Sequence, residues 1–208
     1  MRTENIEKLD ISLGDAIYSL RAIRRLKEDA ISDDDLSTIL DAARQAPNGG
    51  NQQPWHFLVI RDAGLRQKFG VLYREAWWAK RNDGGYFKPE DLPDHYKSAM
   101  GLAESIGTAS VIVLVCTTDS GARESVIPAT QNLLLAARGL GIGGTITTLH
   151  SSVAERARKL LAIPDGVEIV YNVPLGYPKG RFGPVRRKPL QEVVSENAWG
   201  QTPPWACC

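Results

Sequence analysis

APNGGNQQPW, residues 46–55, is a polar and turn-forming stretch that lies directly between a strong helix signal and a strong strand signal. Upstream, Ser32 and the three aspartates after it have the form of an N-cap and an acidic first turn, and apolar side chains then recur at helical spacing. We expect that helix to stop near Pro47, because proline cannot continue it. Downstream, residues 55–60 have the length and the aromatic and β-branched composition of a strand. We therefore expect two rigid elements that hold a polar loop between them.

The loop is rich in glycine and in side-chain amides. Each Asn or Gln side chain offers a donor and an acceptor, which suits the edge of a planar, uncharged heterocycle with alternating carbonyl and NH groups. An ordinary connector has a similar composition, because Asn and Gly favour turns in any case. The loop alone leaves both interpretations open.

Three arginines gather in residues 20–26, Leu-Arg-Ala-Ile-Arg-Arg-Leu, after an amphipathic stretch that begins at Ser12. Ser12 and Asp15 have the spacing of a capping box, so the arginines fall near the end of that helix, where cations suit the helix dipole. Guanidinium groups also match phosphate oxygens with paired hydrogen bonds. A second basic group, residues 186–188, precedes Pro189 in the tail. We expect the two groups to converge on one phosphate, although each alone also fits a solvated surface.

The three segments in this order resemble the nitroreductase family of FMN-dependent oxidoreductases. That family carries an Arg-Arg-Ser-x-Arg-x-Phe motif, then an Ala-Pro-Ser-x-x-Asn-x-Gln-Pro-Trp loop, and a basic residue ahead of Pro-Leu near the C-terminus. The counterparts here are residues 20–26, 46–55 and 187–190, and the Asn-x-Gln-Pro-Trp match at residues 51–55 is the most specific. The resemblance covers roughly residues 12–194.

The chain departs from the family pattern at three positions. Leu20 stands where the family usually has Arg, Ala22 where it usually has Ser, and Asn48 where it usually has Ser. The remaining arginines must then supply the phosphate contacts. The resemblance implies an FMN site made of Arg21, Ala22, Arg24, Arg25, Pro47, Asn48, Gly49, Asn51, Gln53, Thr145, Ile146, Thr147, Arg186 and Arg187.

The resemblance further implies an α+β fold, with a central mixed sheet flanked by helices, and an intertwined homodimer with the FMN at its interface. We expect residues 1–208 to form a single domain with its core at about 12–194 and an extended, proline-rich C-terminal arm over 177–208. Dimerisation would also give the apolar helix over 127–139 and the arm a partner surface.

The expected reaction has two steps, in which NADH or NADPH donates hydride to the flavin, leaves, and is replaced by a small acceptor such as a nitroaromatic or a quinone. The cofactor carries this chemistry, so no catalytic side chain is expected. The arginines and amides would stabilise the anionic reduced flavin. Acceptor choice is expected to depend on aromatic side chains that can stack on a flat compound, or that simply pack their helix: Trp77, Trp78, Tyr86 and Phe87.

Two other classes of function stay open beside this enzyme. A flavin carrier or sensor would bind FMN without turnover, and a basic protein-interaction module would bind no chromophore. Within the family, a reductive dehalogenase or a flavin-fragmenting enzyme also fits the sequence.

Composition excludes several further classes. The chain has 208 residues with 43% hydrophobic content, which can bury one sizeable core. Its net charge of +1 argues against a nucleic-acid partner. The sequence has no apolar run of the roughly 20 residues that cross a bilayer and no apolar signal core in residues 1–10, so a cytoplasmic location without membrane contact is expected.

The cysteines and histidines carry no site signature. His56, His95 and His150 lack metal-ligand spacing, so no metal is expected. Cys116 lies in an apolar strand, and nothing marks the terminal Cys207 and Cys208 as catalytic.

A glycine-rich run over residues 139–144 follows a helix and precedes a short β-rich segment, whereas a dinucleotide-binding fingerprint follows a strand and opens a helix, so we reject that interpretation. Ser152 and Glu155 have capping-box spacing for a helix that reaches Leu161. The other predicted elements are helices over 63–81 and 127–139, strands over 110–117 and 167–175, and a strand or tight loop over 143–148.

Overall fold

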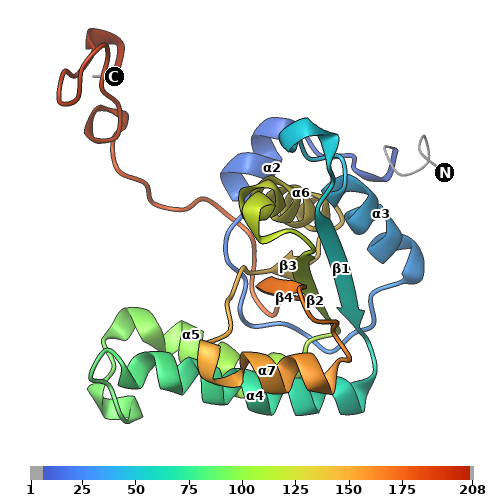
Figure 1. The fold of residues 1–208 in the computed structure, drawn as a ribbon. Helices are drawn as coiled ribbons and strands as arrows, with labels where there is room; N and C mark the ends of the chain where they lie inside the picture. Colours follow the sequence, from blue (N-terminus) through green and yellow to red (C-terminus); the bar gives the residue numbers. More distant parts are fainter. Residues whose placement is uncertain (1–6, 207–208) are drawn as a thin grey trace.

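A four-stranded sheet forms the centre of the computed structural model, with helices on both faces (Figure 1). The structure describes residues 7–206, so Cys207, Cys208 and the first six residues, where no signal core was expected, lie outside the described residues. The elements are α2 (Leu13–Ser19), α3 (Asp33–Ala43), β1 (Trp55–Ile60), α4 (Ala63–Asn82), α5 (Asp94–Ser105), β2 (Val111–Thr117), α6 (Val126–Gly139), β3 (Gly143–Gly144), α7 (Ser151–Leu160) and β4 (Glu168–Gly176).

The strands lie in the order β1-β2-β4-β3, and every pairing among the described residues is antiparallel. The expectation of a mixed sheet is therefore wrong for this chain. Two α-helices separate β1 from β2, and two separate β2 from β4. Each pair returns the chain to the end of the sheet that it left, so Ile60 at the end of β1 pairs with Ile112 at the start of β2. A parallel neighbour would need a crossover that ends at the opposite edge.

The core has two halves, one on each face of the sheet. Val111, Val113 and Val115 of β2 pack toward α3 and α6, whereas Ile112, Leu114 and Cys116 pack toward α4 and α5. Because both faces of β2 are buried, the strand is a continuous apolar run instead of an alternating one.

The N-termini of three helices show which of the predicted N-caps are correct. Ser12 accepts a hydrogen bond from the Asp15 amide (2.9 Å) and Ser32 from the Asp35 amide (3.0 Å), which confirms both N-caps. The predicted cap of α7 is wrong. The helix begins at Ser151, and the ring of His150 accepts from the Ser152 amide while also pairing with Asp83 at the end of α4. That long-range contact to α4 has no local sequence signal.

The chain after β4 leaves the body of the molecule as an arm (Figure 1). Residues 184–189 have no regular structure, and two short 3₁₀ turns follow, Leu190–Glu192 and Pro204–Ala206. The Trp199 side chain on this arm is fully exposed. No helix within residues 7–206 is both long and apolar enough to cross a membrane.

Candidate functional site

The basic segment over residues 20–27, which we call the strap, is fastened to two segments that are distant in sequence. The Ile23 amide donates to the Gly144 carbonyl (2.9 Å), and the Lys27 amide donates to the Tyr177 carbonyl (2.7 Å). On the other side, the Lys179 amide donates to the Arg25 carbonyl (2.9 Å). The main chain alone therefore holds the arginines of the strap beside β3 and beside the start of the arm.

Two glycines permit this close approach. A Cβ atom on Gly143 would lie 2.8 Å from the Ile23 side chain, and one on Gly144 would lie 2.8 Å from Leu175 and 2.9 Å from the Pro174 carbonyl oxygen. Real Cβ atoms do not come so close to other atoms without movement of a neighbour. The glycine-rich run thus brings the strap against the sheet, and it extends from the last residue of α6 through β3.

A pocket of about 310 Å³ lies where these segments meet, and we call it the strap pocket. Five of its lining residues were predicted as site residues, and they come from the strap, the segment after β3 and the arm. They are Arg21, Ala22, Thr145, Ile146 and Arg187, and the other lining residues are Ile17, Leu20, Gln131, Leu134 and Gly144.

The charges in the strap pocket suit an anion. Neither Arg21 nor Arg187 pairs with a carboxylate among the residues that the structure describes. Within residues 7–206, the Arg187 side chain donates only to the carbonyl of Arg186, at 3.2 Å. Two guanidinium groups at one pocket without a counter-charge match the oxygens of a phosphate. Arg25 and Arg186 are exposed and do not line this pocket.

Arg24 lies on the inner side of the strap, near Tyr73 of α4. Burial raises the pKa of the Tyr73 hydroxyl above its ordinary value, and a hydrogen bond with Thr147 and the charges of Arg24 and Arg81 act in the opposite direction. The Tyr73 side chain is only 4% exposed and is therefore shielded from solvent. Arg24 and Thr147, both predicted site residues, therefore meet at the same tyrosine.

Asn172 of β4 pairs with Thr147 of the 145–147 segment. It was not among the predicted site residues. The Thr147 amide (2.9 Å) and hydroxyl (2.8 Å) both donate to the Asn172 carbonyl, and the Asn172 amide donates to the Thr147 carbonyl (2.8 Å). Its fully buried side-chain amide has no protein partner among the described residues. A polar residue within the apolar run over 167–175 was the signal that could have identified it.

The loop over residues 46–55, which we call the amide loop, is stabilised by hydrogen bonds between its own residues. The Asn48 side chain accepts from the Gln53 amide (2.8 Å) and donates to the Ala46 carbonyl (3.4 Å). Gly50, Asn51 and Gln53 adopt left-handed backbone conformations, with φ near +55° in each. The Asn48 side chain therefore helps to fix the shape of the loop, and its predicted contact with a flavin stays a prediction.

The amide loop takes no part in the strap pocket of its own chain. None of the residues that line the strap pocket comes from the loop. Its other predicted site residues are exposed: Pro47, Gly49, Asn51 and Gln53.

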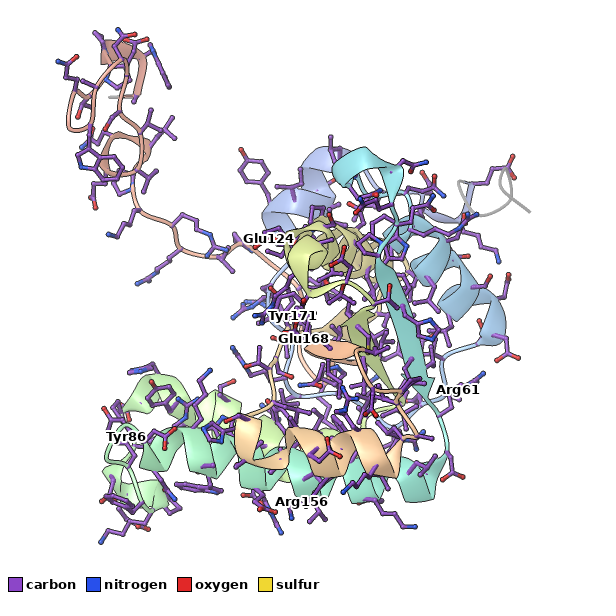
Figure 2. All side chains as sticks on the ribbon, viewed as in Figure 1. Arg61, Tyr86, Glu124, Arg156, Glu168 and Tyr171 are labelled. Atoms are coloured by element: carbon purple, nitrogen blue, oxygen red, sulfur yellow. The ribbon has the colours of Figure 1, made fainter. Side chains whose placement is uncertain are left out.

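The four predicted stacking residues divide between core and surface. Trp77 is only 6% exposed and contacts Trp78 edge to face, with ring centroids 5.1 Å apart. Figure 2 shows Tyr86 at the loop that joins α4 to α5, where its ring packs edge to face on Tyr96 at 5.9 Å. Phe87 is 70% exposed. The structure therefore favours core packing for Trp77 and leaves Phe87 accessible.

No group of three or more His, Cys, Asp or Glu side chains within residues 7–206 has an arrangement that could hold a metal ion.

Comparison with known proteins gives consistent matches. A family model described as "Nitroreductase family" matches residues 17–177. A protein of Archaeoglobus fulgidus, named for NADH dehydrogenase or NAD(P)H nitroreductase activity, is 31% identical over 172 residues, which are 78% of this chain and 83% of the relative. An iodotyrosine deiodinase of Thermotoga neapolitana is 30% identical over 185 residues, which are 88% of this chain and 95% of the relative.

Among solved structures, an iodotyrosine deiodinase bound to FMN and 3-iodo-L-tyrosine has a TM-score of 0.73 at 25% identity. The match covers 90% of this chain and 99% of that chain. The family model spans the strap, the amide loop and the 145–147 segment together.

Proposed function

This chain belongs to the nitroreductase family, and we propose that it is an FMN-dependent oxidoreductase that uses NADH or NADPH to reduce a small nitroaromatic or quinone acceptor. The observation that carries the proposal is the strap pocket, where Arg21 and Arg187 reach one point from opposite ends of the chain. Relatives with NAD(P)H nitroreductase and FMN in their names or bound in their structures support it.

The donor groups of the strap pocket fit FMN. Arg21 and Arg187 would hold the phosphate, because they are the guanidinium groups that lack a carboxylate there. Arg24 places a positive charge beside Tyr73 and Thr147, where it would favour an anionic reduced cofactor. When bound, FMN supplies the two-electron chemistry, in one half-reaction with the nicotinamide nucleotide and a second with the acceptor.

We also propose a homodimer, because the amide loop is exposed and absent from the strap pocket of its own chain. In a symmetric dimer the loop of one copy can approach the strap pocket of the other, and the arm can pack on the second copy. The cofactor site would then need residues from both chains.

Reductive dehalogenation is a second candidate, supported by the 30% identity to the Thermotoga neapolitana iodotyrosine deiodinase over 95% of that relative. Iodide release from 3-iodo-L-tyrosine under anaerobic reduction tests this candidate. A flavin carrier would show neither iodide release nor nucleotide oxidation in the presence of an acceptor.

The first test is the visible spectrum of the purified protein, followed by release of its chromophore and anaerobic addition of NADH or NADPH. We expect FMN, a flavin spectrum that bleaches with one of the nucleotides, and its return when a quinone is added. A bound flavin that does not bleach would indicate the carrier. A protein that cannot be loaded with FMN would overturn the proposal.

A further inference from the structure

Arg81 ends a stripe of three side chains on one face of α4, outside the lining of the strap pocket. Tyr73, Trp77 and Arg81 are spaced four residues apart, so they lie one above another on the helix. The Arg81 side chain runs back along the helix, and its guanidinium carbon lies 4.8 Å from the ring centroid of Trp77. On its other side, Tyr96 of α5 lies 4.2 Å away, so the guanidinium sits between two aromatic rings.

The charge of Arg81 has no counter-charge within the part of the chain that the structure describes. Its neighbours in this layer are paired, since Arg74 contacts Glu104 and Arg156 contacts Glu75. The nearby Asp83 pairs with His150 instead. Arg81 forms no such pair, and its Nε is buried without a hydrogen-bond partner. A partly desolvated guanidinium without an anion is unfavourable, so this position favours a bound anion.

Arg81 is linked to the proposed flavin site through one tyrosine. The charges of Arg81 and Arg24 both act on the Tyr73 hydroxyl, which hydrogen-bonds with Thr147. Thr147 follows Ile146, a lining residue of the strap pocket. A compound that lies over this segment can therefore direct an anionic group toward Arg81, while Trp77 and Tyr96 keep the guanidinium plane fixed.

Resting on the proposed function, we propose that Arg81 binds the carboxylate of a flat aromatic acceptor and makes this enzyme selective for aromatic acids. A planar guanidinium held between rings presents its edge, and a carboxylate matches that edge with two parallel hydrogen bonds. The exposed Phe87, in the loop after α4, supplies an accessible aromatic face for the ring of the same molecule. Arg81 is thus a specificity-determining residue.

A matched pair of compounds tests this inference without turnover. The oxidised, FMN-loaded protein is titrated calorimetrically with 4-nitrobenzoate and with its uncharged isostere 4-nitrobenzamide, in the absence of a reductant. The wild type should bind the acid at least about 5-fold more tightly than the amide, because one charge-assisted contact differs. Equal binding, or tighter binding of the amide, would overturn the inference whatever the variants do.

Two variants locate the effect. Arg81→Gln should weaken binding of the acid by about 10- to 100-fold and change binding of the amide by less than about 3-fold. The control Lys80→Gln removes the same charge from an exposed neighbour and should change neither. Equal weakening of both compounds by Arg81→Gln would indicate a structural role, and no weakening would indicate no role, so either result overturns the inference.

Steady-state kinetics separate this inference from the proposed function. If the wild type reduces 4-nitrobenzamide or a quinone but shows no preference for the acid in kcat/KM, the function stands and the inference fails. If no acceptor is reduced and neither nucleotide bleaches the flavin, the proposed function fails, while the titration still decides whether Arg81 binds the acid.

Discussion

At the residue scale, the site depends on which of the arginines without a counter-charge line the strap pocket, because Arg25 and Arg186 also lack a carboxylate partner within the described residues but lie outside that pocket. Arg44, Arg61, Arg74, Arg156 and Arg158 each contact a carboxylate, whereas Arg21 and Arg187 do not within the described residues. Sequence spacing cannot make this distinction, because it shows where the charges are and not what faces them. The convergence of the strap and the tail could be anticipated from the family motif, but the choice of Arg21 over Arg25 required the structure.

We predict that Arg21→Ala combined with Arg187→Ala lowers FMN affinity by roughly 100-fold or more. Each substitution removes a charge-assisted contact of about 1.5 to 3 kcal/mol, and the two contacts should act on one phosphate. Quenching of flavin fluorescence on addition of apoprotein measures the dissociation constant. The control is Arg186→Ala, an exposed arginine outside the strap pocket, which should bind FMN normally. An unchanged affinity in the double variant would show that the phosphate lies elsewhere.

Gly143 provides a second prediction, because its missing side chain lets the strap lie against β3. In Gly143→Ala the new Cβ would lie 2.8 Å from Ile23, so we expect a loss of about 1 to 3 kcal/mol in unfolding free energy and weaker FMN binding. Urea unfolding and the same flavin titration measure both. Gly180→Ala is the control, because a Cβ there meets nothing within 4 Å. Normal stability and affinity in Gly143→Ala would mean that the strap moves without cost.

At the element scale, most of the fold follows from hydrophobic periodicity. The predicted strand over 55–60 and the predicted helices over 63–81 and 127–139 agree with β1, α4 and α6 to within one residue at each end. These segments are long or strongly patterned, and Ser12 and Ser32 mark boundaries by local chemistry, whereas α3 already ends at Ala43, before Pro47. The nitroreductase-like α+β fold is confirmed by the family match and by the likeness to solved structures.

What escaped prediction at this scale depends on contacts between elements. The helix α5 was not predicted, and its Pro93 start has no side-chain cap. The start of α7 depends on His150, whose partner Asp83 lies on α4. Strand direction depends on how pairs of helices return the chain to the sheet, which no local pattern contains. The amide loop was predicted as a site, yet its position relative to the strap is a matter of tertiary, and by our proposal quaternary, arrangement.

The buried thiol of Cys116 in β2 should make the stability of the protein depend on pH. Burial raises the pKa of the Cys116 thiol to about 11, from an ordinary value of 9.0. The folded state therefore retains a proton that the unfolded state loses above pH 9, so the free energy of unfolding should fall as pH rises from about 9 to about 11. The loss across that window is roughly 2 to 3 kcal/mol.

Urea unfolding at pH 8, 9, 10 and 11 measures this slope, with Cys116→Val as the matched variant. Valine fills a similar volume and does not titrate. Between pH 9 and pH 11 the unfolding free energy of Cys116→Val should therefore fall by less than that of the wild type, by roughly 2 to 3 kcal/mol. Identical slopes for the two proteins would contradict the raised pKa.

At the scale of the whole molecule, surfaces that one chain leaves uncovered are consistent with a second copy. Leu13, Ile17 and Tyr18 of α2 are exposed, and so is Ile146 beside the strap pocket. The arm, which leaves the body of the molecule (Figure 1), carries the exposed Leu190 and Val193. Exposed apolar side chains of this kind are typical of interaction sites, and by our proposal a symmetric dimer would cover the same residues on both copies.

We predict that removal of the arm after Gly183 abolishes both the dimer and FMN binding, whereas removal after Ser195 does neither. The first truncation deletes Arg187 together with the segment that leaves the body, and the second keeps residues 184–195. Light scattering should give about twice the mass of one chain for the full protein, whose chain is 22.8 kDa, and for the protein truncated after Ser195. Because Arg187 belongs to the strap pocket of its own chain, the full-length Arg187→Ala variant separates the two effects. It should remain dimeric with weakened flavin binding, and a monomeric Arg187→Ala would show that the charge, and not the arm, holds the copies together.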